Sequence, residues 1–411
     1  MSAAPRPRQT HLRAADLRDA GRLVVDATLG LTGLVEHLHH NILRTPGPLG
    51  AASERPTGGI TGLVYRSIRG VTRLVGGSLD ALLGQVVTLL GPSEVPASAE
   101  REAVLSALNG VLGDHLEATG NPLAIAMALR HEGQALTIER AALARAVPQP
   151  HRRVLLMVHG LCMNPLQWRR HGHEHGAALA AEGGFTALYL HYNSGLHIST
   201  NGRLLADRLQ ALMDAWPVPL EEIVILGHSM GGLVARSACH QAQARGDAWP
   251  QRLTKMVFLG SPHHGAPLER GGHWIDVILG ASPYTAAFAR LGKLRSAGIT
   301  DLRHGSLLDA DWADELASAK GGDRRTRVPL PEGVACYAIA GSLGSEAGAL
   351  REKLLGDGLV PLASALGRHR VKSRALSFAP DHQWVGQGMN HLDLLDRAEV
   401  LAKVRTWLLP A

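Results

Sequence analysis

The stretch Ile223-Val-Ile-Leu-Gly227-His228-Ser229-Met230-Gly231-Gly232 decides the fold. A β-branched run comes directly before its Gly-x-Ser-x-Gly pattern, and a helical run follows it at once. A turn this tight between a strand and a helix leaves no room for side chains two positions before and after the serine, and Gly227 and Gly231 meet that demand. The strained turn projects the serine hydroxyl above the sheet edge. We therefore predict Ser229 as a nucleophile, with the Met230 N–H directed at a developing oxyanion.

The composition is that of an ordinary globular chain. It has 411 residues, of which 45% are hydrophobic and 19% are charged, and a net charge of +6, so a disordered protein is excluded. Only six of the 42 basic residues are lysines, and the arginines are scattered, so we predict no nucleic-acid partner. The cysteines, Cys162, Cys239 and Cys336, are too far apart to indicate a disulfide framework or a zinc site.

The N-terminal sequence and the longest apolar stretch bear on localisation. Charged residues interrupt every apolar run between Arg6 and Asp26, and residues 74–90 fall short of about 18 uninterrupted apolar residues. We therefore expect a cytoplasmic protein with no signal peptide and no membrane span. The helix predicted at 60–90 has an aliphatic arc opposite an arginine stripe, and it either lies peripherally on an anionic membrane or packs on the rest of the chain. The stripe consists of Arg66, Arg69 and Arg73.

The pattern changes near residue 150. Upstream, helix-period segments at 16–43, 60–90, 100–117 and 122–146 predict an all-helical N-terminal region, 1–150. Downstream, β-rich runs alternate with helical ones, which predicts an α/β domain at 151–411 with a mostly parallel central sheet flanked by helices. The runs are 154–159, 186–192, 223–226, 255–259, 334–340 and 374–378. Residues 266–327, with apolar side chains at helical spacing, are predicted to form a helical cap insertion.

A second oxyanion donor is expected from a loop after an earlier strand. The run Leu155-Leu-Met-Val-His159-Gly160 has the pattern of a buried strand that ends in His-Gly. Because Gly160 lets the backbone turn inward, we assign this donor to the N–H of Leu161, with Cys162 as the alternative. The other interpretation is that His-Gly is simply a turn at the end of a strand.

A serine hydroxyl needs a base, and the base needs a carboxylate to orient it. In this architecture the chain order is Ser, acid, His. The best placed histidine is His391, between the last predicted strand and the C-terminal helix. For the acid we choose Asp357, flanked by glycines in a predicted loop; Asp381 and Asp393 are the alternatives.

Together these motifs form an ordered set: His159-Gly160, Gly227-His-Ser-Met-Gly-Gly232, Gly260-Ser-Pro-His-His-Gly265, Asp357-Gly-Leu-Val360 and Asn390-His391-Leu-Asp. The set resembles the α/β-hydrolase superfamily, and within it the lipase and esterase branch that includes bacterial triacylglycerol lipases and the catalytic domain of GPI inositol-deacylases. The resemblance covers about residues 150–411 and implies the α/β-hydrolase fold. It also implies hydrolysis of carboxylic esters through an acyl-enzyme, with no cofactor. Some lipases of this branch bind calcium through an Asp placed like Asp393, but a surface or capping role is the alternative, and we predict no metal.

Hydrolases that act on esters with hydrophobic acyl groups need an apolar acyl pocket. The candidates are Met163, Trp168, Trp274, Phe288 and Leu359, each of which is otherwise an ordinary core residue. The expected substrate is a small-molecule or lipid ester. The same triad could transfer acyl groups or cleave thioesters, and an inactive hydrolase domain that binds a membrane or a partner is the third alternative. Oligomeric state does not follow from the sequence.

Overall fold

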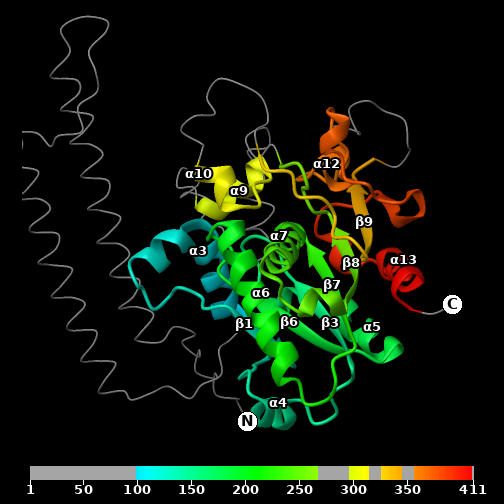
Figure 1. Ribbon diagram of the computed structural model, residues 1–411. Helices are drawn as coiled ribbons and strands as arrows, with labels where there is room; N and C mark the ends of the chain where they lie inside the picture. Colours follow the sequence, from blue (N-terminus) through cyan, green and yellow to red (C-terminus); the bar gives the residue numbers. More distant parts are fainter. Residues whose placement is uncertain (1–98, 267–295, 314–324, 345–355, 410–411) are drawn as a thin grey trace, which may run out of the picture. The chain divides into compact units, whose positions relative to one another are not determined.

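The computed structural model describes residues 99–266, 296–313, 325–344 and 356–409 (Figure 1). By its contacts the chain divides into one unit of Met1–Arg101 with Ala118–Leu123 and a second unit of Glu102–Glu117 with Ala124–Ala411. The second unit holds the sheet and the candidate catalytic residues, and the account below concerns it. The predicted helices at 16–43 and 60–90, with the arginine stripe, lie outside the described residues.

The centre of the second unit is an eight-stranded sheet in the order β10-β9-β8-β7-β3-β6-β1-β2. Its strands are β1 Ala128–His131, β2 Gln134–Ala135, β3 Arg153–Val158, β6 Thr186–His191, β7 Glu222–His228, β8 Leu253–Leu259, β9 Ala335–Ser342 and β10 Gln383–Gln387. Neighbours from β10 to β6 run parallel, whereas β1 pairs antiparallel with both β6 and β2. A mostly parallel sheet is thereby confirmed. A separate two-stranded ribbon pairs β4 Arg169–Arg170 with β5 His173–Glu174.

Helices cover both faces of this sheet (Figure 1). They are α3 Ala99–Ala118, α4 Arg140–Ala146, α5 His175–Gly183, α6 Ile198–Ala215, α7 Met230–Arg245, α9 Ala297–His304, α10 Asp309–Ala313, α12 Leu362–Ala365 and α13 Ala398–Leu408. Short 3-10 turns are η1 Pro165–Trp168, η2 Trp249–Arg252, η5 Lys372–Arg374, η6 Pro380–His382 and η7 Asp393–Leu395. In Figure 1, α5 and α13 lie on one side of the strands and α6 and α7 on the other. Among the described residues, no helix is both long and apolar enough to cross a bilayer.

The strands alternate between two hydrophobic cores. In β3, Leu156 packs into the core with α6 and α7, whereas Leu155 and Met157 pack into the core with α5 and α13. The same alternation runs through β6, β7, β8 and β9. Because both faces of these strands are buried, the sequence of each strand is a continuous apolar run. Such runs are recognisable in the sequence alone.

The prediction of a helix over 122–146 is wrong for most of that segment. Only α4 is helical, and β1 and β2 form a hairpin on the edge of the sheet. Glu132 and Gly133, the two residues between these strands, both have positive φ (48° and 82°), the backbone that a two-residue hairpin turn requires. The N-terminal region is therefore not all helical. Tertiary pairing of β1 with β6 outweighs the local apolar spacing that suggested a helix.

The last strand also differs from expectation. Residues 374–378 form no strand, and the edge strand is β10, Gln383–Gln387. Its side chains are mostly half-buried, since an edge strand packs less completely than a central one, so it lacks the apolar run that marked the others. Of the predicted cap at 266–327, the structure describes α9 and α10. Ile299 and Leu302 of α9 are buried in the core shared with α6 and α7, and most of the remainder lies outside the described residues.

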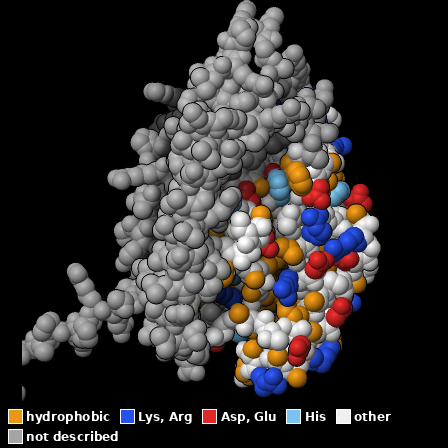
Figure 2. Space-filling view, turned by 90° about the vertical axis from the view of Figure 1, so that its left-hand side faces the viewer, with side chains coloured by type: hydrophobic (Ala, Val, Ile, Leu, Met, Phe, Trp, Pro, Cys, Tyr) orange, Lys and Arg blue, Asp and Glu red, His pale blue; other side chains and the backbone are white. Residues whose placement is uncertain are grey.

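The described part of the face in Figure 2 carries basic and acidic side chains interspersed. Two ion pairs involve α6 and α7. Arg203 of α6 contacts Asp309 of α10 at 2.8 Å, and Arg245 of α7 contacts Asp207 of α6 at 2.7 Å. Neighbouring charges of opposite sign largely cancel at a distance. These two ion pairs therefore add little net charge to α6 and α7.

Candidate active site

Ser229 forms the junction between β7 and α7 and has a backbone of φ 53° and ψ −124°. Positive φ in a residue with a Cβ is a strained conformation that persists where the surroundings impose it. Here the Ser229 N–H donates to the Leu259 carbonyl at 2.8 Å. A Cβ on Gly227 would lie 2.7 Å from the Gly232 Cα, and one on Gly231 would lie 2.2 Å from the Val158 carbonyl oxygen. The two glycines are therefore required by close packing, as the motif predicts.

Asp357 and His391 form a buried pair. The His391 Nδ1–H donates to Asp357 Oδ2 at 2.7 Å, and the two side chains are 2% and 1% exposed. The other carboxylate oxygen, Oδ1, accepts the N–H groups of Leu359 (3.0 Å) and Val360 (2.8 Å). Because the carboxylate holds the proton on Nδ1, the lone pair of His391 is on Nε2, where a base needs it.

The alternative acids have other environments. Asp393 Oδ2 accepts the backbone N–H of Asn390 at 2.8 Å, which is a loop-capping contact. Asp381 lies in the short turn η6, before the edge strand. Between the three candidates, the structure places Asp357 against His391.

The serine and the Asp357–His391 pair meet at the end of β8. A Cβ on Gly260, the residue after Leu259, would lie 3.0 Å from His391 Cε1 and 3.1 Å from Asp357 Oδ2. The backbone N–H of Ser229 donates a hydrogen bond to the carbonyl of Leu259 itself. Within the described residues, no hydrogen bond joins the Ser229 hydroxyl to the His391 imidazole. In enzymes without bound substrate such a bond is often long and tightens when the substrate arrives.

The turn after β3 lies beside the nucleophile. A Cβ on Gly160 would be 3.0 Å from Ser229 Cβ. The Cys162 N–H is engaged, since it donates to Ser194 Oγ at 3.0 Å, which favours Leu161 over Cys162 as the oxyanion donor. Met230 is the first residue of α7, so its N–H has no acceptor within the helix.

The predicted pocket residues have mixed positions. Met163 and Trp168 are buried in the core with α5 and α13, and Trp168 packs edge-on against His228 with ring centroids 6.3 Å apart. Leu359 is half-buried against the opposite core. Trp274 and Phe288 lie outside the described residues. The acyl-pocket role of this set stays a prediction.

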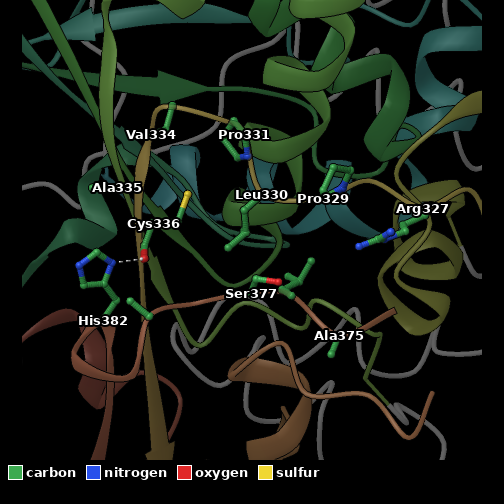
Figure 3. A pocket seen from close by; sticks show the side chains of 12 residues that line it. Arg327, Pro329, Leu330, Pro331, Val334, Ala335, Cys336, Ala375, Ser377 and His382 are labelled. Carbon is green, nitrogen blue, oxygen red and sulfur yellow. Dashed lines mark hydrogen bonds between the residues drawn. The ribbon is translucent and has the colours of Figure 1, made fainter. Parts of the chain in front are cut away.

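A cavity of about 390 Å³ lies elsewhere, at the beginning of β9 (Figure 3). Its wall includes Leu330, Cys336 and His382, and the His382 Nδ1–H donates to the Cys336 carbonyl at 3.1 Å. Ser229 follows the carboxyl end of β7, and β9 runs parallel to its neighbours. This cavity therefore lies at the amino ends of the parallel strands, whereas Ser229 lies at their carboxyl ends.

His228 is a site residue that the sequence analysis missed. It is fully buried, its Nε2–H donates to the His391 carbonyl at 3.1 Å, and the two rings contact each other at an interplanar angle of 46°, with centroids 4.6 Å apart. Burial, and then the charge of His391, hold the pKa of His228 well below its usual value, so the ring is neutral. His228 thus ties the serine turn to the loop that carries His391. The motif gives no signal for this, because its second position accepts any side chain.

Buried histidines make the stability of the fold depend on pH. Burial lowers the pKa of His159 to about 3 and that of His175 to about 4. A folded-state pKa below the unfolded value of about 6.5 means that protons bind the unfolded chain preferentially, so stability is full above that pH and is lost as pH falls towards 4. Between its folded and unfolded pKa values, each such histidine should change the free energy of unfolding by about 1.4 kcal/mol per pH unit.

Urea unfolding of the full chain between about pH 7.5 and pH 4.5 measures this slope. We expect His175→Gln to have a shallower dependence than the unmodified chain. An identical slope in both proteins would show that His175 titrates normally in the fold.

Part of the chain is similar to a known protein family. Residues 149–321 match the family model of the PGAP1-like alpha/beta domain. The domain has the α/β-hydrolase fold. The match covers β3 to α10 of this α/β domain and includes Ser229. No curated protein matches the chain.

Several solved structures are similar in fold to this chain. The mature lipase BlEst2 of Bacillus licheniformis is 16% identical, with 64% of this chain and 94% of that chain covered and a TM-score of 0.39. Lipase B of Aspergillus fumigatus is 13% identical, with 67% and 54% covered and a TM-score of 0.36. The type II thioesterase YbtT of the yersiniabactin pathway is 15% identical, with 63% and 93% covered and a TM-score of 0.37.

Proposed function

We propose that this protein is a serine hydrolase that cleaves carboxylic esters, with hydrophobic acyl groups, through an acyl-enzyme. The observation that carries the proposal is the buried Asp357–His391 pair, which lies with the strained Ser229 around the end of β8. Burying the Asp357 carboxylate with the His391 imidazole lowers the stability of the fold, and so does the positive φ of Ser229. A catalytic triad accounts for all three features together.

The mechanism follows from the positions of these groups. The Ser229 hydroxyl attacks the acyl carbonyl carbon while His391 Nε2 takes its proton, and Asp357 stabilises the imidazolium that forms. The N–H groups of Leu161 and Met230 donate to the oxyanion of the tetrahedral intermediate. His391 then protonates the leaving alcohol, and the acyl group stays on Ser229. Water, deprotonated by His391, attacks the acyl-enzyme, which releases the acid and restores the serine.

Two alternatives use the same domain differently. Acyl transfer and thioester cleavage need the same three side chains, so they differ only in the acceptor or the leaving group. An inactive protein that binds a membrane or a partner would rely on the arginine stripe predicted from the sequence at 60–90, which lies outside the described residues. The pairing of Asp357 with His391 favours a catalytic role over that alternative.

A fluorophosphonate probe tests the proposal. We expect the full chain to take up one probe molecule, to have the adduct mapped to Ser229 by peptide mass spectrometry, and to release p-nitrophenol from short- and medium-chain esters. Parallel assays with an added alcohol, and with an acyl thioester, distinguish the other acyl chemistries. An adduct on a different residue would overturn the assignment of the nucleophile.

A further inference from the structure

Helix α3 packs directly against the turn that follows β3. A Cβ on Gly110 would lie 2.2 Å from Cys162 Sγ and 2.9 Å from Cys162 Cα, closer than the 3.0 Å below which real Cβ atoms are essentially never found. The Cys162 Sγ also lies 3.9 Å from the carbonyl of Ala107, one turn earlier in the helix. Only glycine at position 110 allows this approach.

The same helix holds the loop that follows β6. Asn193 Nδ2 donates to the Gly113 carbonyl at 2.9 Å, and a Cβ on Gly113 would lie 1.8 Å from Asn193 Oδ1. The next residue of this loop is Ser194, whose hydroxyl oxygen accepts the Cys162 N–H at 3.0 Å. α3 therefore supports Cys162 twice, directly at Gly110 and indirectly through the loop.

Cys162 needs this support because its backbone is strained. Its φ is 59°, and it is the third residue of a turn in which the Met163 N–H donates to the Gly160 carbonyl at 3.4 Å. Positive φ at that position is normally supplied by glycine. Burial raises the pKa of the Cys162 thiol to about 12, so the side chain is not a nucleophile here and its role is structural. Within the described part of the chain, the Leu161 N–H in the same turn has no acceptor.

The other side of α3 is fixed to the fold as well. Ser296 Oγ donates to the Gly110 carbonyl at 2.7 Å, and the Ala297 N–H donates to Asp114 Oδ2 at 2.8 Å, so the start of α9 braces the helix (Figure 1). Nearer its beginning, Glu102 pairs with Arg130 of β1 through two contacts of 3.1 Å. The helix is thus anchored on both sides of Gly110.

We propose that α3 is a positioning element of the active site: Gly110 and Ser194 hold Cys162 in the left-handed conformation that leaves the Leu161 N–H free to bind the oxyanion. The inference rests on the proposed function. An oxyanion donor acts only within about 2.7–3.1 Å of the developing charge. A displacement of about 1 Å lowers the rate by roughly 10²-fold.

Gly110→Ala in the full chain tests the proposal, because the added methyl must displace Cys162. We expect kcat on a p-nitrophenyl ester to fall roughly 10²-fold with little change in KM. The inhibition constant of a trifluoromethyl ketone, which forms a tetrahedral oxyanion on the serine, should rise in parallel. Hydrogen exchange at the turn, measured without substrate, should accelerate. Adding Cys162→Gly to this variant removes the clashing sulfur. The double variant should regain most of the lost kcat and most of the lost affinity for the ketone.

Gly176→Ala is the matched control. Gly176 also lies in a helix, α5, and its Cβ would be 2.5 Å from the Tyr189 hydroxyl, on the opposite face of the sheet. We expect it to lower Tm without changing the ketone inhibition constant. Unchanged exchange at 160–163 in Gly110→Ala would overturn the role of α3 whatever the activity. Faster exchange with unchanged ketone affinity would show that this turn is not the oxyanion site. Absence of turnover and of labelling in the unmodified chain would instead refute the proposed function.

Discussion

Ser229→Ala is expected to lower kcat by about six orders of magnitude and to abolish phosphonate labelling. In the proposed mechanism the Ser229 hydroxyl at the β7–α7 junction forms the acyl-enzyme, and alanine leaves His391 without a hydroxyl to deprotonate at that position. What remains is the small acceleration from the oxyanion donors acting on water. Turnover of p-nitrophenyl esters and the intact mass after labelling measure both effects. A labelled Ser229→Ala protein would contradict the assignment.

Ser229→Gly is the companion variant that tests the strain at this position. It should be as inactive as the alanine variant but more stable, by about 1 kcal/mol, because glycine adopts φ near 53° without the penalty of a Cβ. Thermal unfolding of the two inactive proteins compares them under the same conditions. Equal stability would mean that the Ser229 backbone is relaxed.

Asp357→Asn is expected to lower kcat by about 10⁴-fold while the fold is retained. The amide oxygen can still accept the Leu359 and Val360 N–H groups, so the loop keeps its shape. The amide nitrogen then faces His391 Nδ1 and donates to it, which moves the imidazole proton to Nε2 and leaves no base for the serine. Ester turnover measures the loss, and the circular dichroism spectrum checks the fold.

Asp381→Asn and Asp393→Asn are the controls for this change. Neither carboxylate contacts His391 in the described structure, so both should cause much smaller losses of kcat than Asp357→Asn. A loss at Asp393 as large as that at Asp357 would show that the acid of the triad was assigned to the wrong residue.

Sequence patterns predicted the central strands well. β3, β7 and β8 begin or end within two residues of the expected positions, because burial on both faces makes each a continuous apolar run. The edge of the sheet was not predictable in this way. β10 is a half-buried run with a glycine, and β1 and β2 exist because they pair with β6 and with each other. Strand pairing across distant parts of the chain leaves little trace in local periodicity.

The amino-acid sequence by itself predicted Ser229 as the nucleophile, the chain order of the proposed site and the parallel sheet, since each depends on neighbouring residues or on a short repeat. Only the tertiary structure decided which carboxylate meets His391, because Asp357 is 34 positions away along the chain. The choice of Leu161 over Cys162 as donor likewise depends on Ser194, 32 positions from Cys162. Hydrogen bonds between loops are set by how the ends of the strands pack together. The need for Gly110 arises in the same way, from the close approach of a helix that no local pattern specifies.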